Sequence, residues 1–338
     1  MYLANIHNFR TVAILGIVGA HSLHNFDWGN DVILFRSFDT LFNESSIWFF
    51  FIAGFLFQYL SKKFNAKDYY ITKIKNVITP YLILSVPALI GSLTFVDQEM
   101  PAGFEDKHIV MQIFLFLITG KHLAPFWFVP TISIIYVFAP LLIKADRAKW
   151  PYYALPPLLL MSAMLGRDGF LDITHLGGYF SPVSKVIYLF PIYFLGMFCS
   201  QFKDSVSRYV IAWHWPLLAV ALAAFWAEVM LPDAPIEYIF VFKAITALLL
   251  VYYLDIFGKD MLARISYVGT ASFGIFFVHG YFLQIVKMGK NYLTGTQFFP
   301  GHVLSLLIFI AAITAISCLT LWIAQKIFGK NSRLVVGV

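Results

Sequence analysis

The sequence predicts an all-α fold, a polytopic bundle of membrane helices. Of its 338 residues, 60% are hydrophobic and only 12% are charged, a composition far from that of soluble proteins. Apolar stretches of roughly 20 residues recur along the chain, and that length spans a bilayer as an α-helix. Both cysteines, Cys199 and Cys318, lie inside such stretches, so neither a disulfide framework nor a zinc site is expected. We therefore expect one membrane-embedded domain over residues 1–338 and no soluble domain.

Length and flanking charge divide the chain into about ten transmembrane helices. They are expected at 9–26, 42–60, 77–96, 125–143, 151–166, 185–200, 209–230, 237–257, 265–286 and 300–326. Between the third and fourth of these, residues 109–118 are apolar but short for a full span. This run favours a re-entrant or interfacial helix in the loop 97–124.

Positive charge is sorted by membrane side. With the amino terminus inside, the loops and the tail on that side carry about two-thirds of all lysines and arginines but few of the acids. Because the lysine and arginine bias sets orientation, both termini are expected in the cytoplasm. The net charge of +6 is spread over several loops and forms no single basic patch, so a nucleic-acid partner is not expected.

Arg10 and His21 are two ionisable residues on the first segment, with ten residues between them. Eleven helical steps of about 100° bring both side chains to the same face, about 16 Å apart along the axis. Ionisable groups inside a membrane are costly and mark functional sites. Arginine suits phosphate, and histidine suits proton transfer near neutral pH. The pair therefore predicts an anionic ligand that is held at one membrane surface and acted on at depth.

Each of these two residues also has a simpler interpretation. His21 can be a buried histidine that is hydrogen-bonded to a neighbouring helix. Arg10 can be a positively charged anchor at the inner end of a helix. Their alignment on one face favours the functional interpretation.

Four further motifs follow the Arg10–His21 pair along the chain. They are Phe-Phe-Phe-Ile-Ala-Gly-Phe-Leu at 49–56, Lys-Ile-Lys at 73–75 ahead of Pro-Tyr at 80–81, Phe-Trp-Phe-Val-Pro at 126–130, and Ser-Phe-Gly-Ile-Phe-Phe-Val-His at 272–279. In this order, over roughly residues 5–330, the set resembles the acyltransferase-3 family of membrane acyltransferases. Two departures are visible: Ala53 stands where the family often has serine, and Lys73 and Lys75 stand where many members have arginine.

The resemblance implies an integral-membrane enzyme that moves an acyl group, commonly acetyl, from coenzyme A to a hydroxyl. The acceptor is usually a cell-surface saccharide or a lipid-linked glycan. Acetyl-CoA would be the donor co-substrate, no metal is implied, and the location would be a bacterial inner membrane. Membrane lipids are further partners, and a homo-oligomer is left open beside a monomer. Because the outer loops are net acidic, the sequence favours a neutral or basic glycan, or a lipid-linked one, as the acceptor.

Transfer to an alcohol needs a base that takes the hydroxyl proton as the oxygen attacks the thioester, and His21 is the best candidate. His279 is expected at a similar depth in the ninth segment, where it would bind the acceptor, steady the thioester carbonyl or serve a structural role. Ser272, seven residues before His279, lies on nearly the same helical face and is a candidate for substrate binding.

The loop 62–75 carries five lysines, among them Lys73 and Lys75. Its lysines either orient the protein and contact anionic lipid or bind the phosphates of coenzyme A beside Arg10, and both roles are compatible. Trp127 is either an interface aromatic at the start of a helix or a side chain that packs against the substrate.

A membrane transporter or flippase for a glycan or another polar solute is the alternative from a different class. Ten helices, histidines at mid-membrane depth and several prolines suit that function. An internal repeat, which transporters often show, is missing, and carboxylates inside the predicted spans lie only near their ends, as Asp255 does at an inner end. The acyltransferase is therefore favoured.

Overall fold

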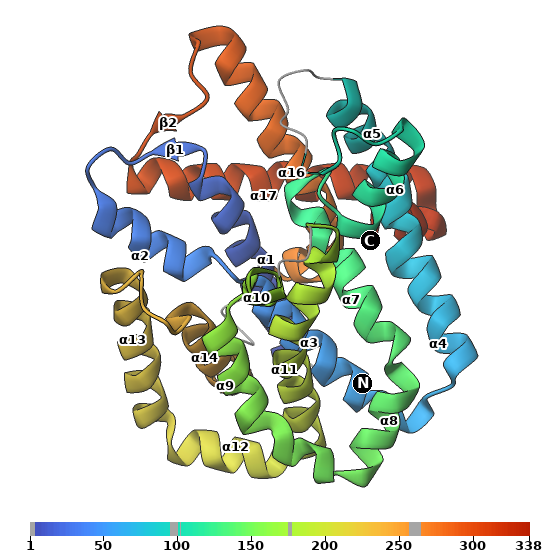
Figure 1. Cartoon of the computed structure of the whole chain (residues 1–338), viewed down its shortest axis with the longest axis vertical. Coiled ribbons are helices and arrows are strands. Elements are labelled where there is room, and N and C mark those ends of the chain that lie inside the picture. The colour runs from blue at the N-terminus through green and yellow to red at the C-terminus, as the bar shows by residue number, and fades with distance from the viewer. Residues whose placement is uncertain (1–3, 95–100, 102, 175–177, 257–264) are drawn as a thin grey trace.

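The computed structural model describes residues 4–94, 101, 103–174, 178–256 and 265–338, and within these the chain is almost entirely helical (Figure 1). The predicted all-α class is thereby confirmed. Among the described residues, six helices are long and apolar enough to cross a membrane, or up to eight spans if each of two bent helix pairs counts as one. The total of about ten spans and the cytoplasmic termini stay predictions.

Every predicted segment lies on a helix. The first half of the chain forms α1 (Ala4–Leu23), α2 (Val32–Phe42), α3 (Ser46–Tyr59), α4 (Ala66–Lys73), α5 (Thr79–Thr94), α6 (Ile109–Thr119), α7 (Phe128–Val137), α8 (Ala139–Ala148) and α9 (Leu155–Leu165). The second half forms α10 (Gly169–Thr174), α11 (Ser181–Gln201), α12 (Lys203–Ala212), α13 (His214–Met230), α14 (Tyr238–Ile256), α16 (Ser266–Thr294), α17 (Val303–Phe328) and α18 (Ser332–Val336).

Two of these helices meet their successors at sharp bends. The chain turns by 70° between Ile109–Thr119 and Ala124–Val137, the geometry of a broken span or a re-entrant loop. This agrees with the interpretation of 109–118 as a segment too short to cross a membrane alone. A bend of 77° follows α12, which lies across the lower end of the molecule beneath α13 (Figure 1).

The closest helix pair is α3 with α11, and glycine makes the close approach feasible. Gly54 lies against the backbone carbonyl of Tyr193, and Gly196 lies against the carbonyl of Phe51, so a side chain at either position would collide with backbone. Small residues allow helix backbones in membranes to come together in this way. Of this pair, α3 packs against α1.

Helix α1 runs through the middle of the bundle and packs against α2, α3, α14, α16 and α17. Just beyond its end, β1 (Phe26–Asp27) pairs in parallel with β2 (Phe299–Pro300), with Phe26 opposite Phe299. The ring of Phe309 on α17 packs against both phenylalanines. The end of α1 is thereby tied to the segment that leads into α17.

Two cations, a buried lysine and a half-buried arginine, hold the turn between α2 and α3. Lys243 of α14 is fully buried and donates hydrogen bonds to the Leu41 carbonyl at 2.7 Å and to Ser45 Oγ at 3.1 Å. Arg167, in the turn after α9, donates through Nη1 to Glu44 Oε1 at 2.7 Å. Pairing of this kind is what lets a charge remain in an apolar interior.

Candidate active site

The two helices that carry the predicted site residues, α1 and α16, pack side by side and run in the same direction. Near their beginnings, His7 Nε2 donates a hydrogen bond to the Ser266 carbonyl at 2.9 Å, and Gly269 lies against the side chain of Thr11. Further along, the rings of His21 and His279 lie side by side. Residues some 260 positions apart in the sequence therefore meet along one line, with polar side chains at both ends and apolar residues between them.

At one end of this line, Arg10 and Ser272 are directly bonded. Arg10 Nε donates to Ser272 Oγ at 3.1 Å, and Ser272 is fully buried. Arg333 of α18 lies near enough to act electrostatically on Arg10. Within the described part of the chain, no carboxylate lies within ion-pair distance of Arg10. Two guanidinium groups without a nearby acid favour the binding of an anion such as phosphate.

At the other end, His21 and His279 face each other with ring centroids 5.3 Å apart and ring planes inclined by 39°. His279 Nδ1 donates a hydrogen bond to the Ile275 carbonyl at 2.8 Å. Because a carbonyl only accepts, the neutral imidazole carries its proton on Nδ1 and a free lone pair on Nε2. That Nε2 atom is buried and has no hydrogen-bond partner among the described residues.

His21 is half-buried, and its ring nitrogens likewise find no hydrogen-bond partner in the part of the chain that is described. Its backbone carbonyl accepts a hydrogen bond from Asn25 Nδ2, which fixes the end of α1 but leaves the ring free. The interpretation of His21 as a histidine hydrogen-bonded to a neighbouring helix thus receives no support. A buried acceptor without a partner costs about 1–3 kcal/mol, so the pair is suited to receive a hydroxyl proton from a bound molecule.

His21 lines a cavity of about 600 Å³ that lies beyond it, on the side away from Arg10. This volume is in the range of small-molecule sites and accommodates a sugar unit. The cavity walls come from the end of α1, from α5, from the loop 121–125 and from α16, where Gly280 and Tyr281 follow His279. Tyr281 Oη donates to the Leu84 carbonyl and so joins α16 to α5 across the cavity.

Two other histidines at this end have ordinary roles. His122 is buried, with Nδ1 bonded to the Phe116 carbonyl at 3.1 Å and Nε2 bonded to Ser85 Oγ at 2.8 Å. His24 is exposed and lies 3.8 Å from a carboxylate oxygen of Asp39. Neither ring stands beside a second imidazole as His21 does.

The lysines of the loop 62–75 differ from one another. Lys73 Nζ lies over the ring of Tyr136 at 4.2 Å and over the ring of Tyr69 at 5.2 Å. Lys75 is exposed on a short π-helical turn, Ile74–Ile78, which packs near α18 and therefore near the segment that carries Arg333. The structure thus separates a lysine engaged with aromatic faces from one that is free to bind an anion.

Two cations lie close to the ring of Trp127. The guanidinium carbon of Arg167 lies 4.5 Å from the ring centroid, and Lys185 Nζ lies 5.0 Å from it. Lys185 is buried and donates to Ser181 Oγ at 2.7 Å. Trp127 thus holds positive charge close to the histidines, since Arg167 acts electrostatically on His21.

Sequence reasoning missed Arg167, Lys185 and Arg333 as members of this site. Lys185 offered a signal, since it is an ionisable residue at the start of a predicted span. Arg167 and Arg333 offered none, because their charges were indistinguishable from those of other loop and tail residues. Only the packing of α18 and of the turn after α9 brings these two to the site.

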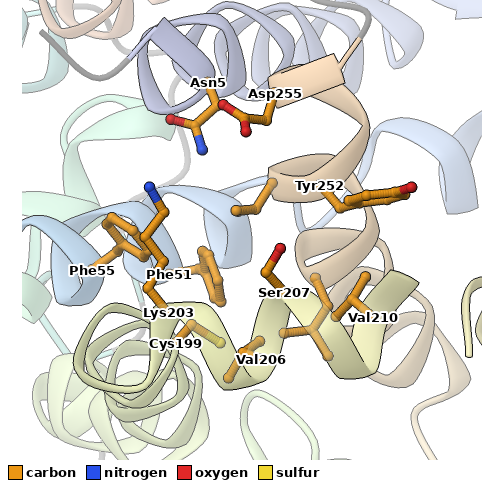
Figure 2. A pocket seen from close by; sticks show the side chains of 12 residues that line it. Asn5, Phe51, Phe55, Cys199, Lys203, Val206, Ser207, Val210, Tyr252 and Asp255 are labelled. Atoms are coloured by element: carbon orange, nitrogen blue, oxygen red, sulfur yellow. The ribbon is translucent and has the colours of Figure 1, made fainter. Parts of the chain in front are cut away.

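A second, smaller cavity lies near the beginning of α1 (Figure 2). Figure 2 shows Asn5 and Asp255 close together above Lys203, with Phe51 and Phe55 on the wall formed by α3. Its volume of about 50 Å³ holds a few water molecules and is too small for a nucleotide. Among the described residues, no three His, Cys, Asp or Glu side chains gather as a metal site requires.

Comparison with known proteins identifies one family. The family model described as an acyltransferase domain matches residues 3–324 of the chain, almost its whole length. No curated protein and no solved structure matches the chain.

Proposed function

The chain belongs to the acyltransferase-3 family, and on this premise we propose that it transfers an acyl group, acetyl in the first instance, from acyl-CoA to a hydroxyl of a saccharide or a lipid-linked glycan. That the protein is a membrane acyltransferase follows from the family and from the apolar helices. The donor, the acceptor and the residue roles are our proposal. The observation that carries it is the His21–His279 pair: the ring of His21 lines a cavity large enough for a sugar, and the adjacent Nε2 of His279 is buried without a partner.

His21 acts as the general base in this proposal. As the hydroxyl oxygen of the acceptor attacks the thioester carbonyl, His21 takes the hydroxyl proton. The new C–O bond forms and the C–S bond breaks, and the leaving thiolate of coenzyme A recovers the proton from the imidazolium. Direct transfer is supported by the absence of a serine or cysteine hydrogen-bonded to the ring of His21 among the described residues.

His279 positions the acceptor beside His21. Its tautomer is set by the Ile275 carbonyl, so its Nε2 lone pair accepts a hydrogen bond from a hydroxyl group. Because the rings are adjacent, a hydroxyl bound at Nε2 lies within reach of His21. Burial excludes water from this position and strengthens each polar contact.

Arg10 holds the donor phosphates, with Arg333 nearby and with Ser272 fixing the guanidinium. Lys75, exposed near α18, extends this basic surface. Lys73 is half-buried and exchanges its aromatic contacts for phosphate when the donor binds, since a cation–π contact is worth about 0.5–2 kcal/mol and a charged hydrogen bond about 1.5–3 kcal/mol. Trp127 does not bind the substrate directly in this proposal. Its ring holds Arg167 and Lys185 in place, and these cations provide positive charge near the substrate.

The donor enters from the cytoplasm of a bacterial inner membrane, and the acceptor meets it from the opposite side. Arg10 and His21 lie about 16 Å apart along α1, a distance that an extended pantetheine arm spans. The nucleotide therefore stays at the basic surface while the thioester reaches the histidines.

Membrane vesicles of defined orientation test this arrangement. Inside-out and right-side-out vesicles from host cells receive labelled acetyl-CoA from one side only, and vesicles with His21→Ala protein serve as the control for background transfer. We expect wild-type transfer only when acetyl-CoA is supplied at the cytoplasmic face. Transfer supported by acetyl-CoA at the opposite face alone would show that the orientation is wrong, and transfer from neither face would contradict the acyl-CoA donor.

A further inference from the structure

The cavity beyond His21 carries positive charge. Lys121 lines it from the loop after α6, and Lys287 lines it from α16, two turns beyond His279. Both lysines are half-buried. Three histidines also contribute to the wall, and none of the described residues that line the cavity is Asp or Glu.

Charges of both signs lie behind the wall. Lys185 is near enough to interact electrostatically with both Lys121 and Arg167. The acids nearby are Glu44, which is paired with Arg167, Asp168, which acts on Lys121, Glu237, which acts on Arg167, and Asp39, which lies beside His24. These acids offset the cations behind the wall, whereas Lys121 and Lys287 lie on a wall whose described residues include no carboxylate, so the cavity itself attracts anions.

Placing lysines in a half-buried wall is costly unless an anion offsets their charge. Resting on the proposed acyl transfer, we infer that the acceptor carries a carboxylate or phosphate group close to the hydroxyl that is acylated, and that Lys121 and Lys287 bind this group. The acidic outer loops favoured a neutral or basic acceptor, but the cavity that an acceptor enters has the opposite charge.

The lysine pair serves the acceptor and not the donor phosphates. Arg10 does not line the cavity and lies eleven residues from His21 on the same helix, about 16 Å away. The cavity begins at His21 and extends past His24, away from Arg10. The two basic regions therefore lie on opposite sides of the histidine pair, and one ligand occupies each.

The first experiment identifies the chemistry of the acceptor. Host cells with wild-type protein and with His21→Ala protein are compared by mass spectrometry of their surface glycans and lipid-linked saccharides. We expect an acyl mass increment, lost in the variant, on a molecule that carries a carboxylate or phosphate. A glycan carboxylate and a lipid-linked diphosphate are distinguished after the lipid is released. An acylated neutral molecule overturns the inference, whereas no acylated molecule overturns the acyl transfer itself.

The second experiment tests the two lysines with the acceptor so identified. Lys121→Gln and Lys287→Gln are each expected to raise the acceptor KM about tenfold, the loss of one charged hydrogen bond, with the KM for acetyl-CoA unchanged. The neutralised acceptor, methyl-esterified or dephosphorylated, should show the same KM with wild type and variants. Lys107→Gln, the same charge change at an exposed residue outside the cavity, should leave both KM values unchanged. An increase in the KM for acetyl-CoA instead would make the cavity the donor site and overturn the inference.

Discussion

The two ends of the line along α1 and α16 differ in how their polar groups are satisfied. At one end, Arg10 is hydrogen-bonded to Ser272 before any ligand is present. At the other end, His279 Nε2 is buried without a partner, and the ring of His21 faces a cavity. A guanidinium that is held in place is suited to bind an anion such as phosphate in one orientation. Imidazole nitrogens without a partner are suited to accept and release protons. The contrast supports our proposal that the Arg10 end binds the donor and that the histidine end carries out the chemistry.

Removal of the base is the strongest way to test that division. His21→Ala should lower the rate of acyl transfer about 10²–10⁴-fold, the usual contribution of a general base, while acetyl-CoA still binds. Single-turnover kinetics and acetyl-CoA titration on purified protein in lipid nanodiscs measure the two quantities. His302→Ala, the same change at an exposed position outside the cavity, is the matched control and should retain its activity. Near-normal turnover by a correctly inserted His21→Ala protein would end the assignment.

A substitution that keeps the charge at the other end should have a smaller effect. Arg10→Lys loses the planar fork that binds phosphate through two hydrogen bonds, so the Kd for acetyl-CoA should rise about tenfold or more. The acceptor KM should not change. Arg147→Lys, at an exposed position on α8, controls for the exchange itself. If both substrates are weakened equally, or neither is, Arg10 serves orientation in the membrane instead.

Loss of the hydrogen bond between α1 and α16 should have the smallest effect of the three substitutions. Ser272→Ala removes the acceptor of the Arg10 Nε–H bond, and the Kd for acetyl-CoA should rise a few-fold, in keeping with about 1 kcal/mol for such a bond. Combined with Arg10→Lys, its effect should be less than additive. Ser317→Ala, a buried serine that bonds only to its own helix at Ile313, should leave binding unchanged. Strict additivity would mean that Ser272 does not position Arg10.

Local patterns in the sequence were enough to predict the helical elements. Each of the ten apolar segments lies on a helix, because hydrophobic length and helical propensity act over neighbouring residues. The same reasoning found the short helix at 109–118 and the common face of Arg10 and His21, since both depend on the geometry of a single helix. It left the number of spans open, because bent pairs such as α12 with α13 depend on packing.

By itself, the sequence determined the all-α membrane class, the family resemblance and the positions of Arg10, His21, Ser272 and His279 along their helices. Only the tertiary structure decided which of these residues meet. The Arg10–Ser272 bond joins residues 262 positions apart, and such a contact depends on how two helices pack rather than on any local pattern. The same holds for Arg333 beside Arg10 and for the lysines around the cavity. Counting charges loop by loop gives only the total charge on each side of the membrane. A bound ligand interacts with the few charged groups that folding brings close to it.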